Sequence, residues 1–270
     1  MKNLKSKLLI GGVSVITLLL VVWLGASYYL YTQASVIIYE YQRSKDVKFD
    51  IPSLEKQKLR LNTGEEIALQ IVPNKTTNKY ILYLHGTWGP LPLIANDLSK
   101  YANVAFVSYP GYEGSSGKSS TDLVNQSADK ALNFLQNKGI TNKQITVFGH
   151  SLGGSPALYL ASKYADLNKV IIVNTFFSMQ KMCELQYSAL CVFAGDIHPS
   201  YKYARSAKSN VLHFHSPNDQ DIPYKQGELL DKEINSKHKF TQISGSHGEP
   251  SVDEIMSKIL TDAETASIFN

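Results

Sequence analysis

The chain has 270 residues, of which 43% are hydrophobic and 19% are charged, and its formal net charge at pH 7 is +4. This length and composition suffice for one large folded domain and exclude a collagen repeat, a coiled coil and a disordered tail. Much of the positive excess comes from Lys2, Lys5 and Lys7, and the nearly balanced remainder gives no reason to expect nucleic acid as a partner. Two cysteines exclude a disulfide-dense scaffold and a four-cysteine zinc site.

The N-terminal segment predicts a membrane anchor. Leu8–Leu30 is mostly apolar and follows the three lysines, and about 20 such residues cross a bilayer as a helix. Because lysines remain on the cytoplasmic side, the chain beyond this helix is expected on the exterior, periplasmic or extracytoplasmic, side. We therefore predict a single-pass transmembrane segment over 1–34. The alternative is a signal peptide cleaved near Ala34, which would leave a secreted, soluble protein.

Residues 35–56 are predicted as a polar juxtamembrane connector, and 57–270 as the folded domain. This domain begins with two strand-like runs around the turn Asn62-Thr63-Gly64, a pattern typical of a hairpin. Apolar strand-like runs then alternate with helical patterns, which predicts an α/β fold with a mainly parallel sheet covered by helices on both faces. The runs are 80–86, 104–110, 145–151, 170–176, 211–216 and 239–244. The helical candidates are 92–102, 121–138, 155–164, 223–235 and 250–264.

A segment of about 177–210 does not follow the alternation and is predicted to be a short insertion. It contains both cysteines, Cys183 and Cys191. An oxidising exterior would permit them to form a disulfide. If the segment were one continuous helix, however, the two residues would be about 12 Å apart along its axis, too far for a disulfide. The sequence leaves both alternatives open.

Gly149-His150-Ser151-Leu152-Gly153 is a G-x-S-x-G motif between a strand-like run and a helical pattern. In that context a sharp strand-to-helix turn exposes the serine hydroxyl, and the flanking glycines avoid clashes with neighbouring backbone. The start of the helix also favours the negative charge that develops beside an attacking serine. The motif therefore predicts Ser151 as a nucleophile.

A serine nucleophile needs a general base and an acid that orients it, and in this architecture they follow in the order acid, then histidine. Asp219 and Asp221 both lie in the loop after the run 211–216. His247 lies in the loop after the run 239–244. Since the carboxyl ends of parallel strands meet at one edge of a sheet, an acid and a base at these positions would lie beside Ser151.

With these motifs the chain resembles the α/β-hydrolase fold serine hydrolases, and most of all the small membrane-anchored members with a short lid. The resemblance covers about residues 55–265 and implies an eight-stranded, mainly parallel sheet. It also implies Asp219 as the acid, since the acid of the family typically stands four residues before a proline, here Pro223. His215-Ser216 departs from the His-Gly that the family often has. The motifs that carry the resemblance are His85-Gly86, 109–117, 149–153, Asp219 and Gly245-Ser246-His247.

The chemistry of acyl transfer requires two backbone donors for the oxyanion. One is the N–H of Leu152, directly after the nucleophile. By resemblance, the other is the N–H of Thr87, and Trp88 beside it is expected to form an aromatic wall of the substrate pocket. His150 is placed at the same pocket by its position in the nucleophile turn.

No cofactor and no metal are predicted. The pair His213 and His215 would lie on one face of a strand, but no third ligand is evident in the sequence. The glycine-rich stretch 109–117 lacks the G-x-x-x-x-G-K-[ST] pattern of a phosphate-binding loop.

The residues therefore predict a membrane-anchored serine hydrolase that cleaves an ester or thioester through an acyl-enzyme, with a small-molecule or acyl ester as substrate. The anchor favours acyl or lipid-derived substrates, although a tether also serves soluble ones. The competing hypotheses are a catalytically silent, anchored interaction module and a soluble esterase released by signal cleavage. The sequence gives no indication of the oligomeric state.

Overall fold

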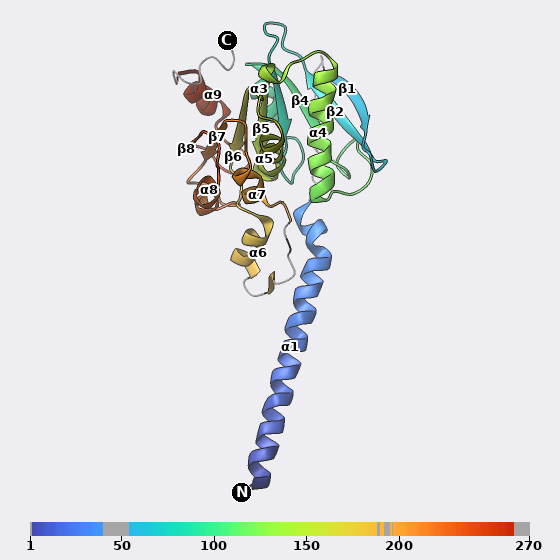
Figure 1. The fold of residues 1–270 in the computed structure, drawn as a ribbon, viewed down its shortest axis with the longest axis vertical. Helices are drawn as coiled ribbons and strands as arrows, with labels where there is room; N and C mark the ends of the chain where they lie inside the picture. The colour runs from blue at the N-terminus through green and yellow to red at the C-terminus, as the bar shows by residue number, and fades with distance from the viewer. Residues whose placement is uncertain (1, 40–53, 188–189, 192–194, 196, 262–270) are drawn as a thin grey trace.

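The computed structural model describes residues 2–39, 54–187, 190–191, 195 and 197–261. Figure 1 shows a long N-terminal helix, α1 (Lys2–Ile38), projecting from a body in which helices flank a sheet. Within the described residues, α1 contains the one stretch long and apolar enough to cross a membrane, Gly12–Ala34, and almost all of that stretch is exposed. A surface of this kind is stable only when lipid or protein covers it.

The sheet has eight strands in the order β1-β2-β4-β3-β5-β6-β7-β8. β2 is antiparallel to both its neighbours, and the six strands from β4 to β8 in that order are parallel. This topology confirms the predicted hairpin and the predicted mainly parallel sheet of eight strands. The strands are β1 (Glu55–Arg60), β2 (Glu66–Val72), β3 (Tyr80–Leu84), β4 (Asn103–Ser108), β5 (Ile145–His150), β6 (Lys169–Val173), β7 (Val211–His215) and β8 (His238–Gln242).

Helices cover both faces of the sheet, as predicted, because successive side chains of each central strand point to opposite faces. In β3, Leu82 and Leu84 belong to one core cluster, whereas Ile81 and Tyr83 belong to the other. The first cluster is completed by α4 (Thr121–Asn137), α5 (Gly154–Lys163), α7 (Ser200–Arg205) and α8 (Tyr224–Asp231). The second is completed by α3 (Pro92–Ser99) and α9 (Val252–Thr261).

The end of α1 is part of the core of the body. The helix continues past residue 34, the predicted end of the anchor, because Ile38 packs against the first core cluster and Tyr39 is only 3% exposed within it. The Tyr39 hydroxyl is hydrogen-bonded to Nε2 of His198, 2.7 Å away. Of the predicted connector 35–56, residues 40–53 lie outside the described part of the chain, and β1 already begins at Glu55.

The predicted insertion 177–210 contains two short helices, α6 (Met179–Tyr187) and α7. Cys183 and Cys191 form a disulfide, with their Cα atoms 5.9 Å apart. The pairing is possible because α6 ends before Cys191, so that the chain is not the continuous helix that would have kept the two cysteines apart. Figure 1 shows α6 on the same side of the body as α1.

Candidate active site

Ser151 lies on a strained turn between β5 and α5. Its φ is +56°, in the left-handed region that costs a non-glycine residue about 1–3 kcal/mol. The turn is possible because its neighbours have no side chain: a Cβ on Gly149 would collide with Gly153, and a Cβ on Gly153 would collide with the carbonyl of Leu84. The local sequence thus directs one serine to the carboxyl edge of the sheet, as the G-x-S-x-G motif predicted.

The structure brings the three sequence-predicted residues Ser151, Asp219 and His247 together. The Ser151 hydroxyl donates to Nε2 of His247 over 2.8 Å, and Nδ1–H of His247 donates to Oδ2 of Asp219 over 2.7 Å. The three residues come from the loops after β5, β7 and β8, and each is less than a tenth exposed. Burial lowers the local dielectric and therefore strengthens both hydrogen bonds.

The Asp219 carboxylate is fixed from two sides. Its Oδ1 accepts the backbone N–H of Asp221 over 2.9 Å and that of Ile222 over 2.7 Å, which leaves Oδ2 for His247. His215 lies behind it, with Nε2 3.7 Å from Oδ2. The exposed Asp221 contributes its backbone to this arrangement, so the geometry favours Asp219 over Asp221 as the partner of His247.

The loop after β3 lies against Ser151. A Cβ on Gly86 would be 3.0 Å from Cβ of Ser151, so that a larger residue here would press against the serine. Nδ1–H of His85 donates to the Gly86 carbonyl over 2.7 Å, and the Tyr112 hydroxyl donates to the Thr87 carbonyl over 2.8 Å. These bonds fix the peptide groups on both sides of Thr87, whose N–H is the predicted second donor. Burial lowers the pKa of His85 to about 3, so this ring is neutral and does not transfer protons.

Two of the pocket residues predicted from the sequence contact His247. The Trp88 and His247 rings meet edge to face, with centroids 6.2 Å apart. His150 is 2% exposed and its Nε2–H donates to the His247 carbonyl over 2.7 Å. Burial first, and then the nearby His247, lower the pKa of His150 to about 3. His150 therefore supports the loop that carries His247, beside the predicted pocket.

Two further polar residues of the site, Asn174 and Thr175, were not predicted from the sequence. Asn174, at φ +49°, accepts the Ser216 N–H at its Oδ1 over 2.8 Å and donates from Nδ2 to the Ser246 carbonyl over 3.3 Å, so it joins the loops of Asp219 and His247. The Thr175 hydroxyl donates to the Ser151 carbonyl over 2.7 Å. The only signal in the sequence was the position of Asn174-Thr175 at the end of a strand-like run.

The residues described contain no group of three or more His, Cys, Asp or Glu side chains arranged to hold a metal ion. His213 and His215, the pair considered above as metal ligands, make other contacts. Nδ1 of His213 is 3.3 Å from Oδ1 of Asp231, and Nε2–H of His215 donates to the Ile222 carbonyl over 3.0 Å. Both rings are buried, and burial lowers the pKa of His215 to about 4.

A parallel sheet covered on both faces, with a serine on the strand-to-helix turn of its central strand, defines a protein of the α/β-hydrolase type. The model of the Alpha/beta hydrolase family matches residues 81–225. The chain belongs to this family.

The chain is also similar to individual proteins and solved structures. An uncharacterized protein of Acanthamoeba polyphaga mimivirus is 30% identical over 227 residues, which cover 73% of this chain and 76% of that protein. An uncharacterized membrane protein of Saccharomyces cerevisiae is 30% identical over 189 residues, 66% of this chain and 65% of that protein. Among solved structures, an esterase of Pyrococcus furiosus has the same fold with a TM-score of 0.58 at 15% identity, over 72% of this chain and 82% of that one. The family assignment supports hydrolase activity, and the likeness to the esterase shows a shared fold.

Proposed function

We propose that this protein is a membrane-anchored serine hydrolase that cleaves an ester or thioester through an acyl-enzyme. The observation that carries the proposal is the continuous pair of hydrogen bonds from Ser151 through His247 to Asp219, with the serine on a strained turn. Strain of this kind persists only where the surrounding structure maintains it, and it is concentrated at functional sites.

In the proposed reaction, Ser151 Oγ attacks the carbonyl carbon while His247 Nε2 accepts the hydroxyl proton. Asp219 keeps the proton of His247 on Nδ1, so that Nε2 is free to act as the base, and stabilises the imidazolium that forms. The N–H groups of Leu152 and Thr87 would donate to the oxyanion. His247 then protonates the leaving group, and water attacks the acyl-serine by the reverse steps.

We further propose that α1 remains attached as a single-pass anchor and that the body lies on the exterior side. The packing of α1 against the body supports retention of the helix, because Ser27 is only 1% exposed and would be lost with the rest of the helix on cleavage near Ala34. The lysines at positions 2, 5 and 7 support the orientation.

Labelling with a fluorophosphonate probe tests the activity. The full-length protein in detergent should be labelled and should hydrolyse p-nitrophenyl butyrate, whereas Ser151→Ala should do neither. Ser155→Ala is the matched control, because this serine lies in the next turn, is fully buried, and its hydroxyl has no hydrogen-bond partner among the described residues. The control should keep both properties. A wild-type protein without labelling or turnover would instead support the silent interaction module.

A further inference from the structure

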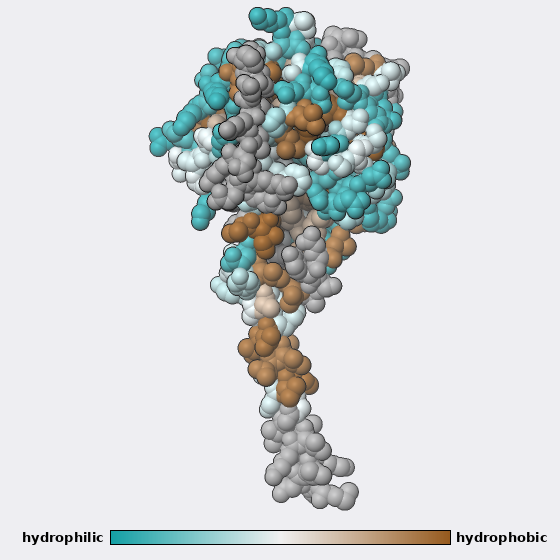
Figure 2. Space-filling model, turned by 180° about the vertical axis from the view of Figure 1, so that it is seen from behind, coloured by the Kyte–Doolittle hydropathy of each residue, from teal (hydrophilic) through white to brown (hydrophobic). Residues whose placement is uncertain are grey.

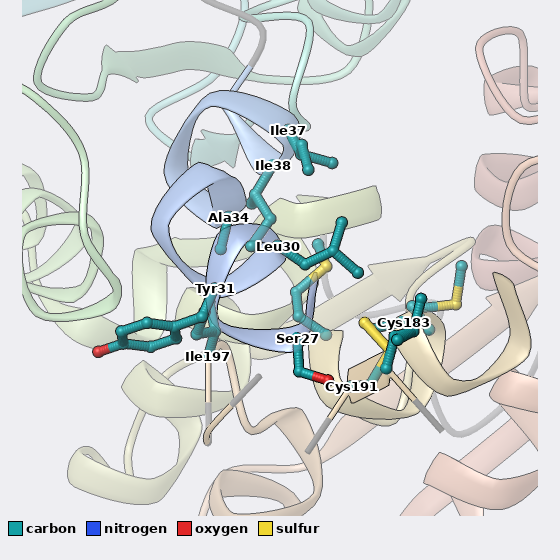
Figure 3. A pocket seen from close by; sticks show the side chains of 12 residues that line it. Ser27, Leu30, Tyr31, Ala34, Ile37, Ile38, Cys183, Cys191 and Ile197 are labelled. Atoms are coloured by element: carbon teal, nitrogen blue, oxygen red, sulfur yellow. A yellow bond between two sulfur atoms is a disulfide. The ribbon is translucent and has the colours of Figure 1, made fainter. Parts of the chain in front are cut away.

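An apolar pocket of about 100 Å³ lies between α1 and the insertion (Figure 3). One wall comes from the last turns of α1, namely from Ser27, Leu30, Tyr31, Ala34, Ile37 and Ile38. The other wall comes from α6 and the segment after it, namely from Met179, Met182, Cys183, Leu190, Cys191 and Ile197. None of these lining residues is charged.

The pocket overlaps the stretch that can cross a membrane. Four residues of its α1 wall, from Ser27 to Ala34, belong to the apolar span Gly12–Ala34. On the neighbouring turns of the helix, Val22 and Leu24 are exposed, and Figure 2 shows apolar surface continuing along α1 to the base of the body. With the span in a bilayer, these four residues of the α1 wall lie at the end of the span nearest the body, where lipid chains, which are about as apolar as leucine, can contact the pocket.

Apolar contacts also connect the pocket to the nucleophile. Leu152, the residue after Ser151, is buried in the first core cluster, and Ile38, Met179 and Met182 of the pocket pack against that same cluster. Thr175, whose hydroxyl contacts the Ser151 carbonyl, is followed after a few residues by Met179, at most about 14 Å further along an extended chain. This upper limit is short enough for a long alkyl chain to span.

We infer that this pocket binds the acyl chain of a long-chain ester that enters from the membrane, while the ester carbonyl lies at Ser151. The inference rests on the proposed hydrolase function and specifies its substrate class. The uncharged lining selects an alkyl chain over a polar headgroup, since burying a polar group without a partner costs free energy. The pocket volume of about 100 Å³ is smaller than the roughly 150 Å³ of an apolar cavity that binds benzene, so the pocket would hold only a few methylene groups of the chain.

Two substitutions on α1 test the pocket. Ala34→Phe would fill it, whereas Val36→Phe places the same ring on the opposite side of the helix, where Val36 is 66% exposed. In full-length protein in detergent micelles, kcat/KM is measured with p-nitrophenyl palmitate and p-nitrophenyl butyrate. In Ala34→Phe, the new ring should exclude about two methylene groups of the alkyl chain from the pocket. This loss should lower kcat/KM for p-nitrophenyl palmitate about tenfold. The butyrate rate should remain unchanged, and Val36→Phe should leave both rates unchanged. Equal losses on both esters, or none, would overturn the inference.

A second test uses the wild-type protein and therefore does not depend on whether a variant folds. A fluorophosphonate with a long alkyl chain that ends in a diazirine is first attached to Ser151 and then irradiated. Cross-links to peptides within 27–38 or 179–191 would support the pocket as the acyl site. Cross-links found elsewhere only, with Ser151 labelled, would overturn the pocket and leave the proposed hydrolase intact. Failure to label Ser151 would overturn the proposed function, and with it the substrate class.

Discussion

Asp219 and Asp221 stand two residues apart in the same loop, but their carboxylates have different surroundings. The Asp219 carboxylate is buried and faces Nδ1 of His247, whereas Asp221 is exposed and contributes only its backbone N–H to the acid. An amide at position 219 would remove the charge that stabilises the imidazolium and would allow the wrong tautomer of His247.

We therefore expect Asp219→Asn to lower kcat by a factor of about 10⁴, as in other triads that lose this charge. Asp221→Asn should leave kcat near the wild-type value, because its backbone N–H is retained. The measurement is the turnover of p-nitrophenyl butyrate by the two purified variants. If Asp221→Asn proves the more damaging change, then Asp219 is misassigned as the acid.

At the residue scale, the residues that could be predicted from the sequence are those that belong to local patterns. Ser151 could be predicted because its motif is local, and His247 because its loop follows a clear apolar run. Asn174 could not be predicted, because its role is to join two loops that are distant in sequence and meet only in the fold. The hydrogen bond of His150 could not be predicted for the same reason, because its partner, the carbonyl of His247, lies in the loop after another strand.

At the scale of elements, the strands were predicted to within a few residues, because parallel strands buried on both faces are continuous apolar runs. The helices of the insertion were not predicted, because α6 and α7 are short and their apolar residues follow no clear period. The extension of α1 beyond residue 34 was also missed. It depends on a contact with the core that local composition does not indicate.

The disulfide of the insertion gives a prediction at this scale. Cys183→Ser combined with Cys191→Ser should lower the free energy of unfolding by under about 3 kcal/mol, because the closed loop is short. The expected result is a lower midpoint of thermal unfolding for the double variant than for the wild type under non-reducing conditions. Reduced wild type should unfold like the double variant. Two free thiols in exported protein, detected by mass spectrometry without reductant, would contradict the pairing.

For the whole molecule, the alternation of strands and helices was enough to predict the parallel sheet and its covered faces. The count of eight strands came from the resemblance to a family, since a short apolar run does not indicate which other strands it pairs with. The position of the body relative to α1 could not be predicted, because it depends on side chains such as Tyr39 and His198, 159 residues apart.

The orientation of the chain in the membrane is a prediction about the whole molecule. We expect a reporter that is active only in the cytoplasm to give no signal when fused after Asn270 in a bacterial host, because the lysines near the N-terminus should remain inside. The same reporter fused before Met1 serves as the control and should be active. A strong signal from the C-terminal fusion would reverse the orientation.

The two edges of the sheet affect how copies of the protein held in one membrane would interact. β1 and β8 end the sheet, and an unpaired strand edge can pair with the edge of another molecule. Exposed basic side chains stand along or beside both edges, with Lys56 and Lys58 on β1 and Lys237 and Lys239 at β8. An anchor of the proposed kind would concentrate the copies and align them, which would favour such pairing. The like charges of these lysines oppose it, because like-charged strands placed side by side repel each other.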